Sequence, residues 1–142
     1  MKINLDKNAG NMIIAYDVGL IRVHGSVQTD AGTAPKIHSV TASAIITPET
    51  VVENWQPTHP SELQPEHMQQ LLEFQPEIVL LGTGRQLRFP ASEIGQACYQ
   101  AGAGFEVMDT GAACRTYNIL AAEGRRVVAA LLMIEPATGG SR

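Results

Sequence analysis

The sequence predicts a single α/β domain, and three features indicate this class. From about Pro57 onward, short apolar runs alternate with longer stretches whose apolar residues recur at helical spacing. Before Pro57, the chain consists of short β-like runs separated by turn residues. The length of 142 residues and the hydrophobic content of 44 % suit one globular domain. We expect residues 1–134 to form this domain and residues 135–142 to form a disordered tail.

The first part of the chain is expected to contain strands. Apolar runs lie at 13–16, 20–23 and 40–46, and turn residues at 29–32 separate the second run from the third. The run at 40–46 is the strongest early strand because it is rich in β-branched residues.

The rest of the chain is expected to alternate between helix and strand. Pro65 suits a helix start because proline lacks only a donor that would be unpaired there, and Pro76 prevents continuation. Gly124 is placed where a glycine ends a helix. The sequence therefore predicts a helix from Pro65 to before Pro76, helices at 91–101 and 110–123, and strands at 77–81, 105–108 and 127–134.

The string Asp109-Thr110-Gly111-Ala112 matches the residues that carry the catalytic aspartate of retroviral-type aspartic proteases. Such enzymes need two aspartates that share a proton, and further strands should follow the string. An alanine-rich helical stretch follows it here. We therefore interpret Asp109 or Thr110 as the N-cap of a helix, where a side-chain oxygen accepts a backbone N–H.

A second motif, Gly82-Thr83-Gly84-Arg85, follows a buried strand. The Rossmann fingerprint needs a third glycine where Leu87 stands, and the P-loop lysine is absent. The simpler interpretation is a tight turn that uses the backbone freedom of glycine. A small-anion site remains an alternative because of Arg85.

Cysteine, histidine and tryptophan give weaker signals. Cys98 and Cys114 are expected to be buried, although Arg115 and a helix start could activate the Cys114 thiol. The four histidines show no ligand spacing, so no metal site is expected. Trp55 is either a lid on the core or an interface anchor, and the sequence leaves both open.

The charge distribution limits the classes of partner. The net charge is −4, and no Lys or Arg lies between Lys36 and Arg85, where six glutamates fall. Such a chain is poorly suited to neutralising phosphates, which argues against nucleic acid as a partner. No apolar run approaches the roughly 20 residues of a membrane span, and the first residues lack the apolar centre of a secretory signal. We therefore expect a cytoplasmic protein.

Several motifs together resemble a known family. They are residues 76–84, 107–110, 116–120 and 123–125, together with Trp55. Over about 14–134 the chain resembles a domain-of-unknown-function family of small α/β proteins from bacteria and archaea. In eukaryotes this family includes the mitochondrial respiratory complex I assembly factor 3 and an adipogenesis-associated protein. The resemblance implies three layers: a central mixed, mostly parallel sheet, helices on one side, and a small N-terminal β layer. It implies no catalytic residue and no cofactor.

Two functions are consistent with these observations. The favoured one is a non-enzymatic assembly or interaction factor that binds a protein partner, through Trp55 and the acidic middle segment; a role related to respiratory complex I comes from the resemblance alone. The alternative is a ligand- or anion-binding protein or an unrecognised enzyme. Its site would form at the carboxyl ends of the strands, from Gly82, Thr83, Gly84, Arg85, Asp109, Thr110, Thr116 and Asn118. The oligomeric state is not specified.

Three polar residues near the end of the last helix are given structural roles. We predict that Glu123 pairs with Arg125, Arg126 or another late arginine. We also predict that Asn118 hydrogen-bonds the backbone of a neighbouring turn, such as 82–85.

Overall fold

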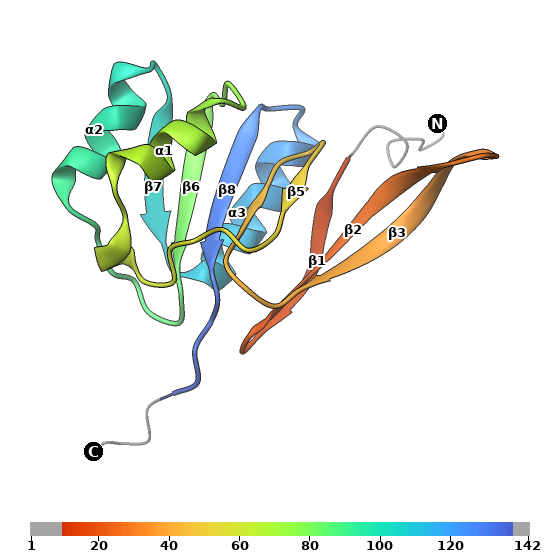
Figure 1. Ribbon diagram of the computed structural model, residues 1–142, viewed down its shortest axis with the longest axis horizontal. Helices are drawn as coiled ribbons and strands as arrows, with labels where there is room; N and C mark the ends of the chain where they lie inside the picture. Colours follow the sequence, from red (N-terminus) through yellow and green to blue (C-terminus); the bar gives the residue numbers. More distant parts are fainter. Residues whose placement is uncertain (1–9, 138–142) are drawn as a thin grey trace.

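A computed structural model describes residues 10–137, and this part of the chain contains two β-sheets and three α-helices (Figure 1). The α/β class predicted from the sequence is confirmed. The elements are β1 (Met12–Asp17), β2 (Leu20–Thr29), β3 (Gly32–Val40), β4 (Ala44–Ile46), β5 (Val51–Val52), α1 (Pro65–Leu72), β6 (Ile78–Thr83), α2 (Ser92–Gln100), β7 (Gly104–Met108), α3 (Thr110–Ala122) and β8 (Val127–Leu132).

The N-terminal β layer is an antiparallel sheet in the order β1-β2-β3. Asp30 and Ala31 form the turn between β2 and β3, and the β2–β3 hairpin extends away from the central sheet (Figure 1). Pro35 lies in β3, an edge strand, where its missing N–H need not break the ladder. This small layer confirms the expected N-terminal sheet.

The central sheet has the order β5-β4-β8-β6-β7. Strands β8, β6 and β7 are parallel, whereas β4 is antiparallel to both β8 and β5. The sheet is therefore mixed and mostly parallel, as expected. Residues 40–46, which we expected to form one strand, are divided between the two sheets. Val40 instead ends β3 of the small sheet, and β4 begins at Ala44 in the central sheet.

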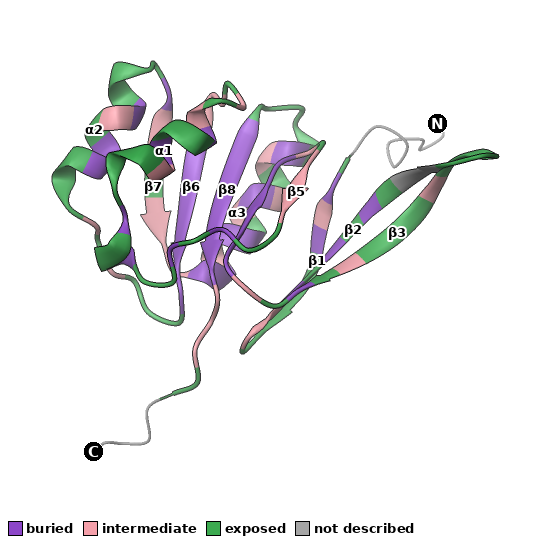
Figure 2. Ribbon diagram, viewed as in Figure 1, coloured by how far each residue is buried: buried purple, intermediate pink, exposed green. Residues whose placement is uncertain are grey.

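Helices cover both faces of the central sheet, and the expectation of helices on one side is corrected. Val79 and Leu81 pack in the core beneath α1 and α2, whereas Leu80 packs in the core formed with α3 and the small sheet. The side chains of β6 and β8 are apolar on both faces, so each face needs a cover. Figure 2 shows both strands buried.

The two ends of α3 form as predicted. Asp109 is the N-cap, and its Oδ1 accepts the N–H of Ala112 (2.9 Å). At the other end Gly124 has a φ of 80° and donates its N–H to the carbonyl of Ala121 (3.0 Å). Arg125 donates its N–H to the carbonyl of Leu120 (3.1 Å), which completes a Schellman motif. The cap interpretation of the Asp109 string is therefore confirmed.

Candidate functional site

The β6–α2 loop meets the start of α3 at the carboxyl ends of β6 and β8. The Thr110 hydroxyl accepts the N–H of Gly84 (2.8 Å) and donates to the carbonyl of Leu132 (2.7 Å). A Cβ at Gly82 would lie 2.9 Å from the Thr110 hydroxyl oxygen, so glycine permits this close approach. The structure therefore brings the glycine turn and the helix start together.

Thr83 organises the loop that follows. Its hydroxyl donates to the carbonyl of Gln86 (2.6 Å) and accepts the N–H of Arg88 (3.1 Å). The hydroxyls of Thr83 and Thr110 are thus engaged by backbone groups. Both threonines were candidate ligand residues, and the structure gives each of them a structural role.

A pocket of about 330 Å³ opens at this junction. Three of the residues expected to form a site line it, namely Gly84, Arg85 and Asp109. Thr116 and Asn118 do not line it. The full lining is Tyr16, Gly84, Arg85, Gln86, Asp109, Gly111, Arg115 and Ile134.

Asn118 binds β1 and not the turn at 82–85, which corrects its expected partner. Its Oδ1 accepts the N–H of Ile13 (2.9 Å), and its Nδ2 donates to the carbonyl of the same residue (2.7 Å). The turn at 82–85 lies at the opposite end of α3, beside Thr110. Asn118 therefore fastens the small sheet to α3.

Tyr16 and Arg115 belong to the pocket, and sequence reasoning missed both. The Arg115 guanidinium donates to the Tyr16 hydroxyl and lies 5.9 Å from the centroid of its ring. A Cβ at Gly111 would lie 2.9 Å from the Tyr16 ring. Tyr16 and Arg115 are 99 positions apart in the sequence and come together only because β1 docks on α3. Of the two, only Arg115 could have been suspected from the sequence, because it is a cation near the start of the helix that Asp109 caps.

Glu135 closes the other side of the loop. Its carboxylate accepts the N–H of Arg85 (2.8 Å) and forms an ion pair with Arg88 (2.9 Å). Burial would raise the pKa of Glu135, but these hydrogen bonds outweigh it and lower the pKa. Glu135 was expected to begin the disordered tail and is instead held in place. Residues 138–142 of that tail lie outside the described residues.

Trp55 is a core residue. The residue is only 3 % exposed, its Nε1 donates to Oε1 of Gln70 (3.1 Å), and its ring packs edge-to-face with the ring of His67 at 6.1 Å between centroids. Of the two roles that the sequence left open, the structure supports the lid on the core. The indole is too buried to anchor a partner.

The two thiols are also buried. Burial raises the pKa of Cys98 to about 11 and that of Cys114 to about 12, and the nearby Arg115 offsets only part of the shift at Cys114. This supports the inert interpretation of both cysteines. No cluster of three metal-ligating side chains occurs within residues 10–137, and no helix in that part is long and apolar enough to cross a membrane.

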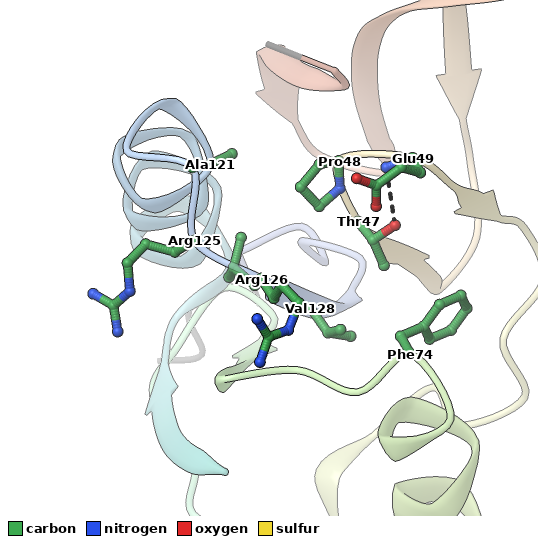
Figure 3. A pocket seen from close by; sticks show the side chains of 10 residues that line it. Thr47, Pro48, Glu49, Phe74, Ala121, Arg125, Arg126 and Val128 are labelled. Carbon is green, nitrogen blue, oxygen red and sulfur yellow. Dashed lines mark hydrogen bonds between the residues drawn. The ribbon is translucent and has the colours of Figure 1, made fainter. Parts of the chain in front are cut away.

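A second pocket of about 290 Å³ lies at the opposite end of α3, between the turn after β4 and the turn before β8 (Figure 3). Arg125 and Arg126 line it, but both bind Glu77 (2.9 and 3.5 Å). Their predicted pairing with Glu123 is therefore wrong. Glu77 lies beside the start of β8, where its N–H donates to the carbonyl of Arg126 (2.7 Å).

With its two separate sheets and three α-helices, the described part of the chain is a small mixed α/β domain of the Mth938-like class. A solution structure from Bordetella pertussis, described as an Mth938-like domain, has a TM-score of 0.71 and 31 % identity, and the match covers 95 % of this chain and 94 % of that one. A crystal structure of a Bordetella parapertussis protein has a TM-score of 0.70 and 36 % identity, covering 87 % and 95 %.

Residues 13–132 match the family described as "Protein of unknown function (DUF498/DUF598)", and the chain belongs to this family. The NADH dehydrogenase [ubiquinone] 1 alpha subcomplex assembly factor 3 of Homo sapiens is 45 % identical over 71 residues. That match covers 50 % of this chain and 37 % of the human protein. The chain thus spans well under two thirds of this relative.

Proposed function

We propose that this domain is a non-enzymatic interaction factor that binds a protein partner, and that the β2–β3 hairpin is its binding surface. The observation that carries the proposal is the exposure of the hairpin beyond the body of the domain. In β3 only Val40 is buried, and Ile37 is 47 % exposed. Beyond His24, where the pairing of β2 with β1 ends, the described hairpin has only two strands, and such a ribbon is marginally stable in water, so a partner that covers it stabilises it.

The composition of the hairpin indicates the chemistry of that partner. Ile37 pairs with His24 in the ladder, Arg22 is exposed on the same face of the sheet, and Lys36 is exposed on the opposite face. Residues 20–40 contain two cationic side chains and one carboxylate, so this segment is slightly positive, whereas the net charge of the whole chain is −4. An apolar surface bordered by carboxylates on the partner would complement this hairpin.

The comparisons support the class of function. The human relative is named as an assembly factor, and assembly factors act by binding other proteins. A role related to respiratory complex I is part of the proposal and rests on that relative alone. The proposal also places the chain in the cytoplasm of a bacterium, which is consistent with its similarity to Bordetella proteins.

Site-specific photo-crosslinking in cells tests this proposal. A photoreactive phenylalanine at position 37 should yield a discrete protein adduct, and charge reversal of Arg22 and Lys36 should remove it. The matched control is position 99 on α2, because Tyr99 is 61 % exposed outside the hairpin. The proposal fails if position 37 gives no adduct, or gives the same adducts as position 99.

A second candidate function is the binding of a small anion, favoured by the pocket that contains Arg85 and Arg115. Titration with inorganic phosphate, followed by amide NMR, tests it. Saturable shifts at Gly111 and Arg115 that disappear in Arg85→Gln would support this candidate. Shifts that are absent or do not saturate would reject it.

A further inference from the structure

We propose that the pocket end of the domain docks on the surface of an anionic phospholipid bilayer. Leu87 and Phe89 would enter the interface, and Arg85 and Arg115 would bind headgroup phosphates. The inference is independent of the hairpin. Both this inference and the small-anion candidate use Arg85 and Arg115, but only this inference requires Leu87 and Phe89.

The first observation is the exposure of apolar side chains in the loop between β6 and α2 and in the neighbouring β1–β2 turn. Phe89 is 73 % exposed and Leu87 is 51 % exposed, in the loop between β6 and α2. Val18, which is 45 % exposed, lies in the β1–β2 turn, and this turn is joined to the C-terminal segment by the hydrogen bond from Gly19 to Ile134 (2.9 Å). In Figure 1 the start of this loop and the β1–β2 turn lie toward the lower ends of the two sheets, and the C-terminal segment after β8 extends below them.

Hydrogen bonds to Thr83 hold the loop on both sides of Leu87. The Thr83 hydroxyl binds the carbonyl of Gln86 and the N–H of Arg88, so Leu87 lies between two anchored residues. Exposed apolar side chains on a loop that is held in place suit a bilayer surface, where they enter the boundary between headgroups and acyl chains.

The second observation concerns charge. Within the described residues, the guanidinium groups of Arg85 and Arg115 form no ion pair, and both residues are exposed. Three carboxylates at this end are held by groups of the protein itself, whereas Glu93, in the first turn of α2, is exposed and forms no ion pair in the described residues. Asp17 accepts the N–H of Val18 (2.7 Å), Asp109 caps α3, and Glu135 pairs with Arg88.

These features fit an anionic bilayer. Arginine has a long stem that lies along apolar surface while its head reaches headgroup phosphates, whereas the short aspartates are tied to the backbone. Each arginine near an anionic surface strengthens binding by roughly fivefold, and burial of the two apolar side chains adds to this.

Vesicle co-flotation of the full chain tests the inference. We expect binding to vesicles of phosphatidylcholine mixed with phosphatidylglycerol, and little binding to phosphatidylcholine alone. The variants Leu87→Ser/Phe89→Ser and Arg85→Gln/Arg115→Gln should each weaken binding by about tenfold or more. The matched controls are Tyr99→Ser/Ile119→Ser, which are 61 % and 60 % exposed elsewhere, and Arg22→Gln/Lys36→Gln on the hairpin. Both controls should bind like the unchanged chain.

A tryptophan at position 89 provides a direct readout, because Trp55 is buried and contributes a constant background. Phe89→Trp emission should shift to the blue on anionic vesicles, and Tyr99→Trp emission should not. The inference is overturned if the apolar double variant binds like the unchanged chain or if position 89 shows no shift. Binding of inorganic phosphate without binding of vesicles would also overturn it, in favour of the small-anion candidate.

Discussion

The carboxamide of Asn118 forms two hydrogen bonds with the backbone of Ile13: its Oδ1 accepts from the Ile13 N–H, and its Nδ2 donates to the Ile13 carbonyl. A single side chain on α3 thereby takes the place of a neighbouring strand at the edge of β1. Tyr117, the preceding residue, donates its hydroxyl to the carbonyl of Asn11 (2.8 Å). These bonds, with the core around Ile13, hold the small sheet on α3.

Asn118→Ala should therefore destabilise the domain by about 1–3 kcal/mol, because it leaves a part-buried N–H and carbonyl of Ile13 without partners. Denaturant unfolding measures the change, and hydrogen exchange should show faster exchange of the Ile13 amide. Ile119→Ala, at a neighbouring exposed position, should change stability by less than about 0.5 kcal/mol. Equal effects of the two substitutions would contradict this role.

Thr110→Val should also cost about 1–3 kcal/mol. Valine has nearly the same shape, but it leaves the buried N–H of Gly84 and carbonyl of Leu132 unpaired. Thr110→Ser keeps the hydroxyl and should recover most of the loss in thermal and denaturant unfolding. If serine were as destabilising as valine, packing of the methyl group would be the main contribution.

Gly124→Ala should cost about 1 kcal/mol because a residue with a Cβ resists the φ of 80° at this position. The backbone is the whole cause, since no heavy atom lies within 4 Å of the added Cβ. Gln96→Ala, at an exposed position of α2, should be neutral or slightly stabilising. A neutral Gly124→Ala in urea unfolding would be inconsistent with the Schellman ending.

The Arg125 guanidinium, hydrogen-bonded to Glu77, lowers the pKa of that carboxyl, although burial acts in the opposite direction. A carboxyl with a lowered pKa in the folded state stabilises the fold above its unfolded pKa. This contribution is lost as the pH falls through the folded pKa. Glu77→Gln should therefore lose less stability than the unchanged chain between about pH 5 and pH 3. Glu123→Gln, which removes a carboxyl without an ion pair in the described residues, should keep the full decrease.

Neither cysteine should react with a thiol reagent in the folded protein near neutral pH. Burial raises the pKa of both thiols and blocks access to the sulfur. Absorbance after addition of a disulfide reagent should show no fast-reacting thiol in buffer and two in denaturant. Rapid labelling of Cys114 in buffer would reinstate the activated thiol at the start of α3.

The local elements could be predicted from the sequence. The alternation of helix and strand after Pro57, the cap at Asp109 and the glycine end at Gly124 depend on residues within a few positions of one another. These features depend on hydrogen bonds and backbone angles of residues that are close in the sequence, so they can be predicted from the sequence alone. The meeting of the glycine turn with the start of α3 also followed from the rule for carboxyl ends of strands.

Contacts between residues far apart in the sequence became visible only in the folded structure. The sequence predicts that Asn118 binds the turn at 82–85, but in the structure it binds Ile13. The arginines predicted to pair with Glu123 instead bind Glu77. Trp55, which could have been an interface residue, lies in the core. Tyr16 joins Arg115 across 99 positions because β1 docks on α3. Helical spacing shows that a polar side chain points away from the core face of its helix, but it does not show which other element that side chain contacts. That choice depends on how two sheets pack around one helix, and packing is a property of the whole chain.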